Sequence, residues 1–139
     1  MNNKINTKLN SLGGIRKIKN LGDNKVELEK ALSAIEVVFG SKLPDFYKDM
    51  QRQFGAFSFN NSIGIKCIDS HPFVSVRNEV SVGDFYTVEG ETEYSTSVVL
   101  ETFNELVPKG LMPICDGELG DLICLSLRKV DFIIIYSLL

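Results

Sequence analysis

The chain has 139 residues, 44% of them hydrophobic, and a formal net charge of −3 at pH 7. That length and composition suffice for one compact domain, which needs neither a disulfide nor a metal to hold it together. The longest apolar run, residues 132–136, is far shorter than the roughly 18 residues that span a bilayer, so the sequence predicts no membrane span.

Residues 1–22 form a basic segment. They include five lysines and arginines and no acidic residue, and the pair Gly13-Gly14 interrupts any helical period. We expect this segment to be a loosely ordered lead-in and residues 23–139 to form the single domain. Residues 23–139 carry 10 basic and 18 acidic residues, a net charge of −8. The domain itself is therefore predicted to be acidic.

Two helices joined by a sharp corner are predicted next. Asn24 suits an N-cap, because Glu27 follows at the spacing of a capping box and apolar residues then recur at helical intervals. Gly40 suits the left-handed residue that ends a helix, and Pro44 suits the first turn of the second helix, which ends at Gly55. The second helix presents an apolar stripe. Its members are Phe46, Tyr47, Met50 and Phe54.

After the second helix the hydrophobic period changes from 3.6 to 2, which indicates strands. Residues 56–59 and 62–68 flank the pair Asn60-Asn61, whose tolerance of positive φ predicts a tight β-hairpin. Further elements are expected at 73–76 and 85–88, as strands, and at 97–107, as a helix.

Acidic residues gather between residues 78 and 108. This stretch contains seven acidic residues and no lysine or arginine. A surface of one sign attracts partners of the opposite sign and repels nucleic-acid phosphates. The structural alternative is a solvated acidic face that keeps the protein soluble, which is the commoner explanation for any single glutamate.

The C-terminal part is predicted to consist of strands. Apolar runs at 111–115 and 122–127 flank a turn at 117–120, and residues 130–136 form a last strand. Its run Ile133-Ile134-Ile135 is an aggregation hazard unless it is paired, so we expect a buried strand inside the sheet rather than a free tail. The fold class is therefore α+β, with an antiparallel sheet of about five or six strands and helices packed against it.

Residue types capable of chemistry are present without a recognisable site. Asp69-Ser70-His71 are adjacent, whereas a catalytic triad is assembled from residues distant in sequence. Cys67 and His71 would need further metal ligands from elsewhere. A third set consists of Asp116, Glu118 and Asp121. These carboxylates lack the spacing of an EF-hand, and a turn with polar caps explains them better. The sequence predicts no catalytic residue, no metal and no cofactor.

The cysteines bear on the compartment. Cys67, Cys115 and Cys124 form an odd set without C-x-x-C spacing, and no secretory leader precedes them. We therefore expect a cytoplasmic protein with reduced thiols.

The order of these features resembles the SUKH superfamily, whose members include yeast cell-wall-synthesis regulators and many bacterial immunity proteins. Its first signature combines a helix acid, a glycine, Leu-Pro and an aromatic residue, matched here by Glu36, Gly40, Leu43, Pro44 and Tyr47. Its second is a Pro-x-Gly-Leu-x-Pro run followed by an Asp- and Gly-rich turn and an apolar strand. It is matched by Pro108, Gly110, Leu111, Pro113, Asp116, Gly117, Gly120 and Asp121. The resemblance covers residues 24–139.

The resemblance implies a binding protein and not an enzyme. It suggests an immunity protein that binds and neutralises a cognate toxin, commonly a nuclease in such systems. The acidic stretch agrees with this function, because nuclease surfaces that hold phosphate tend to be basic. The candidate contacts are Glu89, Glu91 and Glu93, followed by Asp116, Glu118 and Asp121. The alternative is an intracellular interaction or scaffold module of the same fold that acts in regulation without a toxin. The oligomeric state stays open.

Overall fold

The fold is α+β, as predicted. A computed structural model describes residues 3–18, 24–66, 79–103, 106–107, 109–117, 121–127 and 132–137. The helices are α1 (Asn3–Ser11), α2 (Lys25–Phe39), α3 (Asp45–Phe54) and α4 (Thr96–Thr102). The strands are β1 (Ile15–Lys17), β2 (Phe57–Phe59), β3 (Gly64–Lys66), β4 (Glu79–Phe85), β5 (Leu111–Gly117), β6 (Asp121–Ser126) and β7 (Phe132–Ser137).

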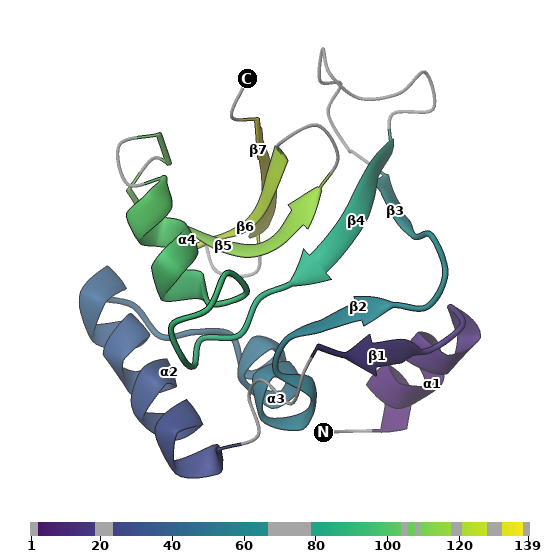
Figure 1. The fold of residues 1–139 in the computed structure, drawn as a ribbon, viewed down its shortest axis with the longest axis horizontal. Helices are drawn as coiled ribbons and strands as arrows, with labels where there is room; N and C mark the ends of the chain where they lie inside the picture. The colour runs from purple at the N-terminus through teal and green to yellow at the C-terminus, as the bar shows by residue number, and fades with distance from the viewer. Residues whose placement is uncertain are drawn as a thin grey trace.

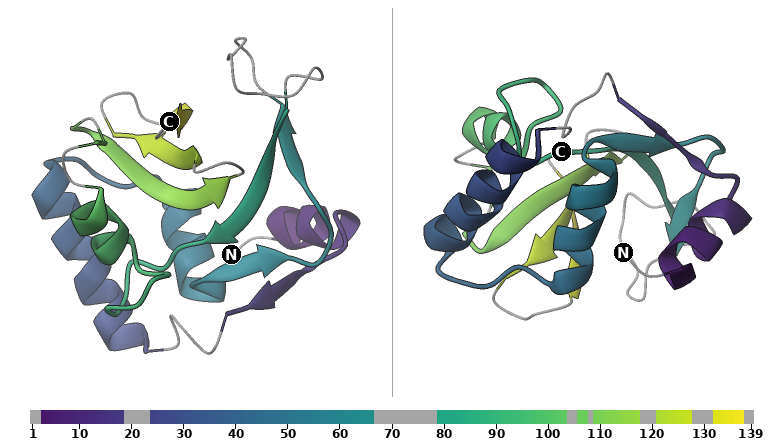
Figure 2. Two further views of the ribbon diagram at one scale, coloured as in Figure 1. Left: turned by 45° about the horizontal axis from the view of Figure 1, so that its top comes forward. Right: turned by 90° about the horizontal axis from the view of Figure 1, so that it is seen from below.

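One antiparallel sheet runs through the molecule. Its main path has the order β1-β2-β4-β5-β6-β7, and β3 pairs with β4 beside that path (Figure 1). Figure 2 shows α3 between α2 and the part formed by α1, β1 and β2. None of the helices in the described residues is long and apolar enough to cross a membrane.

The sheet is covered on both faces where β5 and β6 lie. Along β6, Ile123 and Leu125 belong to the larger core cluster, which includes the buried residues of α2 and α3. Leu122 and Cys124 belong to a second cluster with Val99 of α4. Because successive residues of a strand point to opposite faces, α2 and α3 pack on one face and α4 packs on the other.

Helix α2 begins and ends where the sequence predicts. The Asn24 side chain accepts a hydrogen bond from the Glu27 N–H at 3.2 Å, which satisfies one of the free donors of the first turn. At the other end Gly40 has φ 65° and ψ 28°, and its N–H donates to Val37 O at 3.2 Å. Glycine adopts this left-handed conformation without the steric penalty of a Cβ atom.

Helix α3 differs from the prediction in the side chains that it buries. Pro44 precedes the helix as its N-cap and does not lie in the first turn. Tyr47 is buried as expected. Phe46, however, is 39% exposed, whereas the polar Gln51 is buried. The Gln51 side chain is accommodated because its amide bonds two backbone groups of the segment after β4.

The predicted β-hairpin at Asn60-Asn61 is wrong. β2 pairs with β1 and β4, whereas β3 pairs with β4, so β2 and β3 are not partners. The Asn60 side chain instead donates to Gly13 O at 3.0 Å, and that of Asn61 donates to Leu12 O at 3.3 Å. The asparagine pair therefore binds the turn between α1 and β1, a contact that a local pattern does not reveal.

Residues 3–18, expected to be loosely ordered, contain α1 and β1. Strand β1 pairs with β2, with Ile15 opposite Phe59, and Arg16 Nε donates to Ser58 Oγ at 2.9 Å. Leu9 of α1 is buried, which ties the helix to the rest of the fold. The glycine pair lies in the turn between α1 and β1, where both glycines have positive φ. The boundary between a lead-in and a domain at residue 22 stays a prediction.

The other predicted elements agree in part. β4 begins at Glu79 and ends at Phe85, so it includes only the first residue of the strand predicted at 85–88. α4 ends at Thr102, earlier than predicted. β5, β6 and β7 confirm the three C-terminal strands, but β7 is the last strand of the path and lies at an edge, not inside the sheet. The strand predicted at 73–76, together with Cys67 and His71, lies outside the described residues.

Candidate partner-binding surface

The acidic loop, residues 88–95, connects β4 to α4 and contains three of the predicted contact residues. Glu91 and Glu93 are exposed, and Glu89 is half-buried. At its base the fully buried Thr87 closes the loop, since its N–H donates to Tyr94 O and its carbonyl accepts from Thr96 N, both at 2.8 Å. The two ends of the loop are thus held together by backbone hydrogen bonds.

Hydroxyl groups fix the conformation inside the loop. Ser95 Oγ, fully buried, donates to Glu89 O at 2.9 Å and accepts from Thr92 N at 3.0 Å. Thr92 Oγ1 accepts from Tyr94 N at 3.2 Å. Such local side-chain bonds replace regular secondary structure for the loop backbone. The acidic side chains therefore project from a backbone that is ordered before any partner binds.

Beside the loop, Asp84 and Asp116 extend the negative charge onto the sheet. Asp116 Oδ1 accepts from Asp84 N at 2.7 Å, and a Cβ atom at position 83 would collide with the Asp116 carboxylate, so Gly83 permits this approach. Burial raises the pKa of Asp116, and the Asp84 charge adds to the effect, against the opposing hydrogen bond from Asp84 N–H. Asp116 is therefore a partly desolvated carboxylate next to a second acid.

Tyr94 links the loop electrostatically to these aspartates. The pKa of its phenol is raised, chiefly by the Glu93 charge, with contributions from burial and from Asp84 and Asp116. Such an influence requires that the charges lie near the ring. We use the name acidic patch for Asp84, Glu93, Tyr94 and Asp116.

The structure does not bring all of the predicted contacts together. Asp116 lies opposite Leu122 in the register, so the adjacent Asp121 belongs to the other face of the sheet, where its side chain is 4% exposed. Glu118 lies outside the described residues. Among the predicted contacts that the structure describes, Glu91 and Glu93 are the exposed ones.

The described thiols are buried and inert. Cys115 and Cys124 are free cysteines of the core. Burial raises the pKa of both thiols, that of Cys124 to about 12, so neither carries the thiolate that a nucleophile or metal ligand needs. Within the described residues no three His, Cys, Asp or Glu side chains gather into a metal site.

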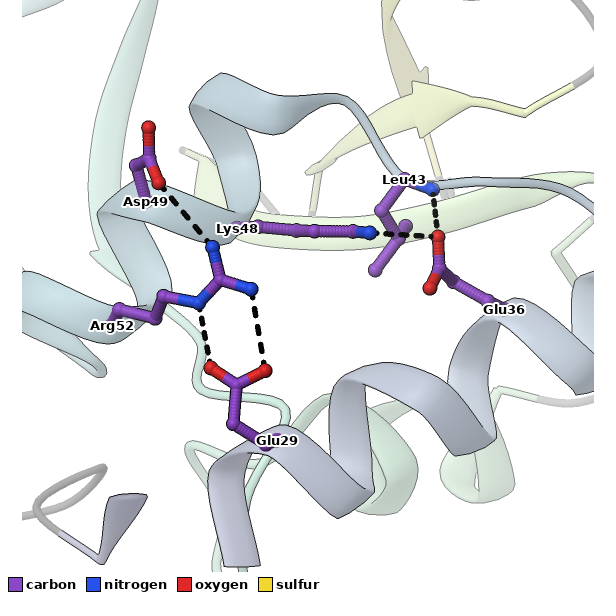
Figure 3. A network of polar contacts seen from close by, with 6 residues as sticks. All are labelled: Glu29, Glu36, Leu43, Lys48, Asp49 and Arg52. Atoms are coloured by element: carbon purple, nitrogen blue, oxygen red, sulfur yellow. Dashed lines mark hydrogen bonds and ion pairs between the residues drawn. The ribbon is translucent and has the colours of Figure 1, made fainter. Parts of the chain in front are cut away.

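The corner between α2 and α3 is built around Glu36. Its carboxylate accepts from Leu43 N at 2.8 Å and pairs with Lys48 Nζ at 3.1 Å, and its side chain is only 13% exposed (Figure 3). Burial opposes the charge, but the Leu43 and Lys48 bonds outweigh it and lower the pKa of Glu36. The carboxylate thus satisfies the N–H of Leu43 just before α3, and its pair with Lys48 ties that helix to α2.

A second ion pair joins the same two helices. Arg52 of α3 holds Glu29 of α2 through two bonds, Nε to Oε1 at 2.6 Å and Nη2 to Oε2 at 3.2 Å (Figure 3). Its Nη1 also donates to Asp49 Oδ1 at 3.4 Å. The bond to Arg52 lowers the pKa of Glu29. Because this ion pair is largely solvated, it orients α2 and α3 relative to each other more than it contributes to the stability of the fold.

The second group of signature residues shapes the entry into the β5–β6 pair. Gly110 has φ 88°, and its carbonyl accepts from Leu127 N at 2.8 Å. Pro113 lies opposite Cys124, where the register then shifts at a bulge. Pro108 and Gly120 lie outside the described residues.

Comparison with known proteins places this arrangement in a family. The SMI1 / KNR4 family (SUKH-1) matches residues 28–137, most of the chain. The chain belongs to the SUKH-1 family. The match begins within α2 and ends in β7, so it includes the corner, the acidic loop and the β5–β6 pair. Neither the curated proteins nor the solved structures compared with the chain contain a match.

Within this SUKH-1 domain the signature residues and the exposed acids lie in different places. Glu36, Gly40 and Leu43 are engaged by their own chain at the corner. Sequence reasoning missed several polar residues that build the loop and its support. They are Gln51, Asp84, Thr87, Thr92, Tyr94 and Ser95. The only signal was the density of Thr and Ser around the glutamates, which is typical of loops that bond their own backbone.

Proposed function

We propose that this SUKH-1 protein is an immunity protein that binds a basic protein toxin through the acidic loop and the acidic patch, and so neutralises it. One observation carries the proposal: Glu91 and Glu93 are exposed on a loop whose backbone is already fixed by Thr87 and Ser95. A loop ordered in advance loses little conformational entropy on binding, which favours affinity.

Electrostatics support the choice of partner. From residue 78 to residue 108 the chain has seven acidic residues and no lysine or arginine, so no positive side chain of this stretch weakens the field of the loop. A toxin that cleaves nucleic acid holds phosphate on a basic surface, and an acidic inhibitor reaches such a surface rapidly. Tyr94 adds an aromatic ring of a type enriched in protein interfaces.

The proposal assigns a binding role in the cytoplasm and no catalysis. The buried thiols of Cys115 and Cys124 are unsuited to nucleophilic chemistry. An acidic surface also disfavours nucleic acid as a direct ligand. Neutralisation is therefore expected to occur by covering the toxin, without modification of either protein.

Co-expression with a toxin encoded next to the gene for this chain tests the proposal, with cell survival as the readout. The wild type should protect, and the double reversal E91K/E93K should protect poorly and bind the purified toxin more weakly. E27K is the matched control, since Glu27 is an exposed acid of α2 that does not belong to the acidic loop or the acidic patch. Binding that does not depend on salt or on these reversals would contradict the electrostatic assignment. Failure to protect against any adjacent toxin would favour a regulatory scaffold.

A further inference from the structure

The two ends of the strand order are built differently. β1 has three residues, Ile15–Lys17, and Arg16 and Lys17 are both exposed. β7 has six residues with the sequence FIIIYS, which contains no charge, no proline and no glycine. Natural sheets protect their edges with short strands, charges or prolines, because an open edge is a template for another strand. β1 carries such protection, and β7 carries none of these devices in its sequence.

The backbone of β7 is engaged on one side. Six register pairs join it to β6, from Asp121 opposite Ser137 to Ser126 opposite Phe132. Within the part of the chain that the structure describes, no strand pairs with its other side, since β7 ends the path. About half of the N–H and C=O groups of an edge strand point away from its neighbour and need partners. The occupant that suits this edge is an extended strand.

The sequence of β7 specifies which strand fits. Residues 132–136 read Phe-Ile-Ile-Ile-Tyr, which is nearly the same in both directions around Ile134. Antiparallel pairing of two copies centred on Ile134 places Ile134 opposite itself and Ile133 opposite Ile135. The aromatic Phe132 then lies opposite Tyr136. Pairs of β-branched residues and pairs of aromatic residues are favourable across antiparallel strands.

We propose that β7 is a dimerisation edge, on which β7 of a second copy pairs antiparallel about a twofold axis at Ile134. Such an isologous contact is closed, because each copy uses its β7 edge once and no β7 edge remains for a third chain. Closure also removes the aggregation hazard of an uncharged, isoleucine-rich strand. The contact involves neither the acidic loop nor the acidic patch, so it does not depend on the proposed toxin.

The unchanged chain provides the first test. Light scattering coupled to gel filtration should give twice the 15.5 kDa of one chain at high concentration and a lower mass on dilution. Hydrogen exchange followed by NMR should show consecutive β7 amides protected in the dimer, and alternate amides exposed after dilution. A monomer at all concentrations, with alternate β7 amides always exposed, would overturn the proposal.

Charge exchange at Ile134 tests the register. I134K and I134E should each be monomeric, because each places like charges opposite one another, and an equimolar mixture should form a heterodimer. At the neighbouring position, a mixture of I133K and I133E should not form a heterodimer, because residue 133 does not face residue 133 of the other copy. A mixture of I133K and I135E should form one, because these two positions lie opposite each other. Rescue by every combination, or by none while the variants remain folded, would contradict pairing centred on Ile134. Where a charged variant does not fold, the hydrogen exchange of the unchanged chain decides the question.

Discussion

The corner between α2 and α3 and the acidic loop both depend on carboxylates, but they use them in opposite ways. At the corner, Glu36 is enclosed, bonded to Leu43 N–H and paired with Lys48. In the loop, Glu91 and Glu93 are exposed, and the backbone is ordered by neutral hydroxyl groups instead.

This difference separates charges that build the fold from charges that remain available to a partner. A carboxylate with two partners of its own chain has little to offer another protein, whereas an exposed one on a fixed backbone keeps its field. Removing a corner residue should therefore reduce stability, and removing a loop glutamate should change binding alone. Gln51 joins the two regions, because it belongs to α3 and bonds the segment that leads into the loop.

Replacement of Gln51 should have the largest effect. Gln51 is 2% exposed, its Nε2 donates to Tyr86 O at 2.9 Å, and its Oε1 accepts from Val88 N at 3.0 Å. Q51A leaves two backbone groups without these partners, and we expect the free energy of unfolding in urea to fall by about 2–4 kcal/mol. Q53A in the same helix is the control. Gln53 is exposed, so this variant should change the free energy of unfolding little. Equal effects of the two variants would mean that Gln51 does not hold the segment.

Replacement of Glu36 should have the next largest effect, and it should depend on pH. We expect E36Q to reduce the free energy of unfolding by about 1–2 kcal/mol at pH 7, because Lys48 loses a charged partner in a half-buried site. The folded pKa lies below the ordinary 4.5, so this stabilisation is complete above pH 4.5 and disappears as the pH falls through the lowered value.

Urea unfolding at a series of pH values measures the Glu36 contribution. The wild type and E36Q should converge in acid, whereas E27Q should match the wild type throughout, since Glu27 is exposed. A difference between wild type and E36Q that stayed constant down to acid pH would show that the Glu36 charge does not stabilise the corner.

Replacement of Ser95 should separate loop order from loop charge. S95A removes a hydroxyl that bonds both Glu89 O and Thr92 N, and we expect a loss of about 1 kcal/mol in stability. Toxin affinity should fall further than stability does, although no charge has changed, because the glutamates lose their fixed positions. S97A is the control, because Ser97 is exposed and its bond to Gly90 O is long, at 3.5 Å. Unchanged affinity in S95A would show that the order of the loop is irrelevant to binding.

The corner could be predicted from sequence because its determinants are local. Asn24, Gly40 and Pro44 act on backbone within a few residues: the structure confirms the two ends of α2, and it places Pro44 one residue before α3 as its N-cap. Asn60-Asn61 suggested a local hairpin turn, but Asn60 instead bonds Gly13 in the turn after α1, 47 residues away in sequence. A pattern of turn residues contains no information about such a distant contact.

Of the acidic loop, only the charge could be predicted from the sequence. The glutamates are evident from composition, but Asp84 joins Asp116 through strand pairing, and Asp121 is excluded from their face by the alternation of β6. Gln51 is not part of the apolar stripe predicted for the second helix, yet the structure buries it against backbone groups. Side-chain environments of this kind depend on tertiary pairing, which one sequence does not display.

The smallest effect, and the most local test of the acidic patch, concerns Tyr94. Glu93 is the main reason why the pKa of this phenol is raised above 10.0, so E93Q should lower the pKa of Tyr94 towards that value. E91Q should leave it nearly unchanged, since Glu91 is not among the groups that shift it. Both variants should retain the wild-type free energy of unfolding, because exposed acids of the loop do not support the fold. NMR titration of the Tyr94 ring measures the shift directly. If E93Q and E91Q acted alike on the ring, Glu93 would not be the neighbour of Tyr94, and the acidic patch would lose the residue that joins the loop to the sheet.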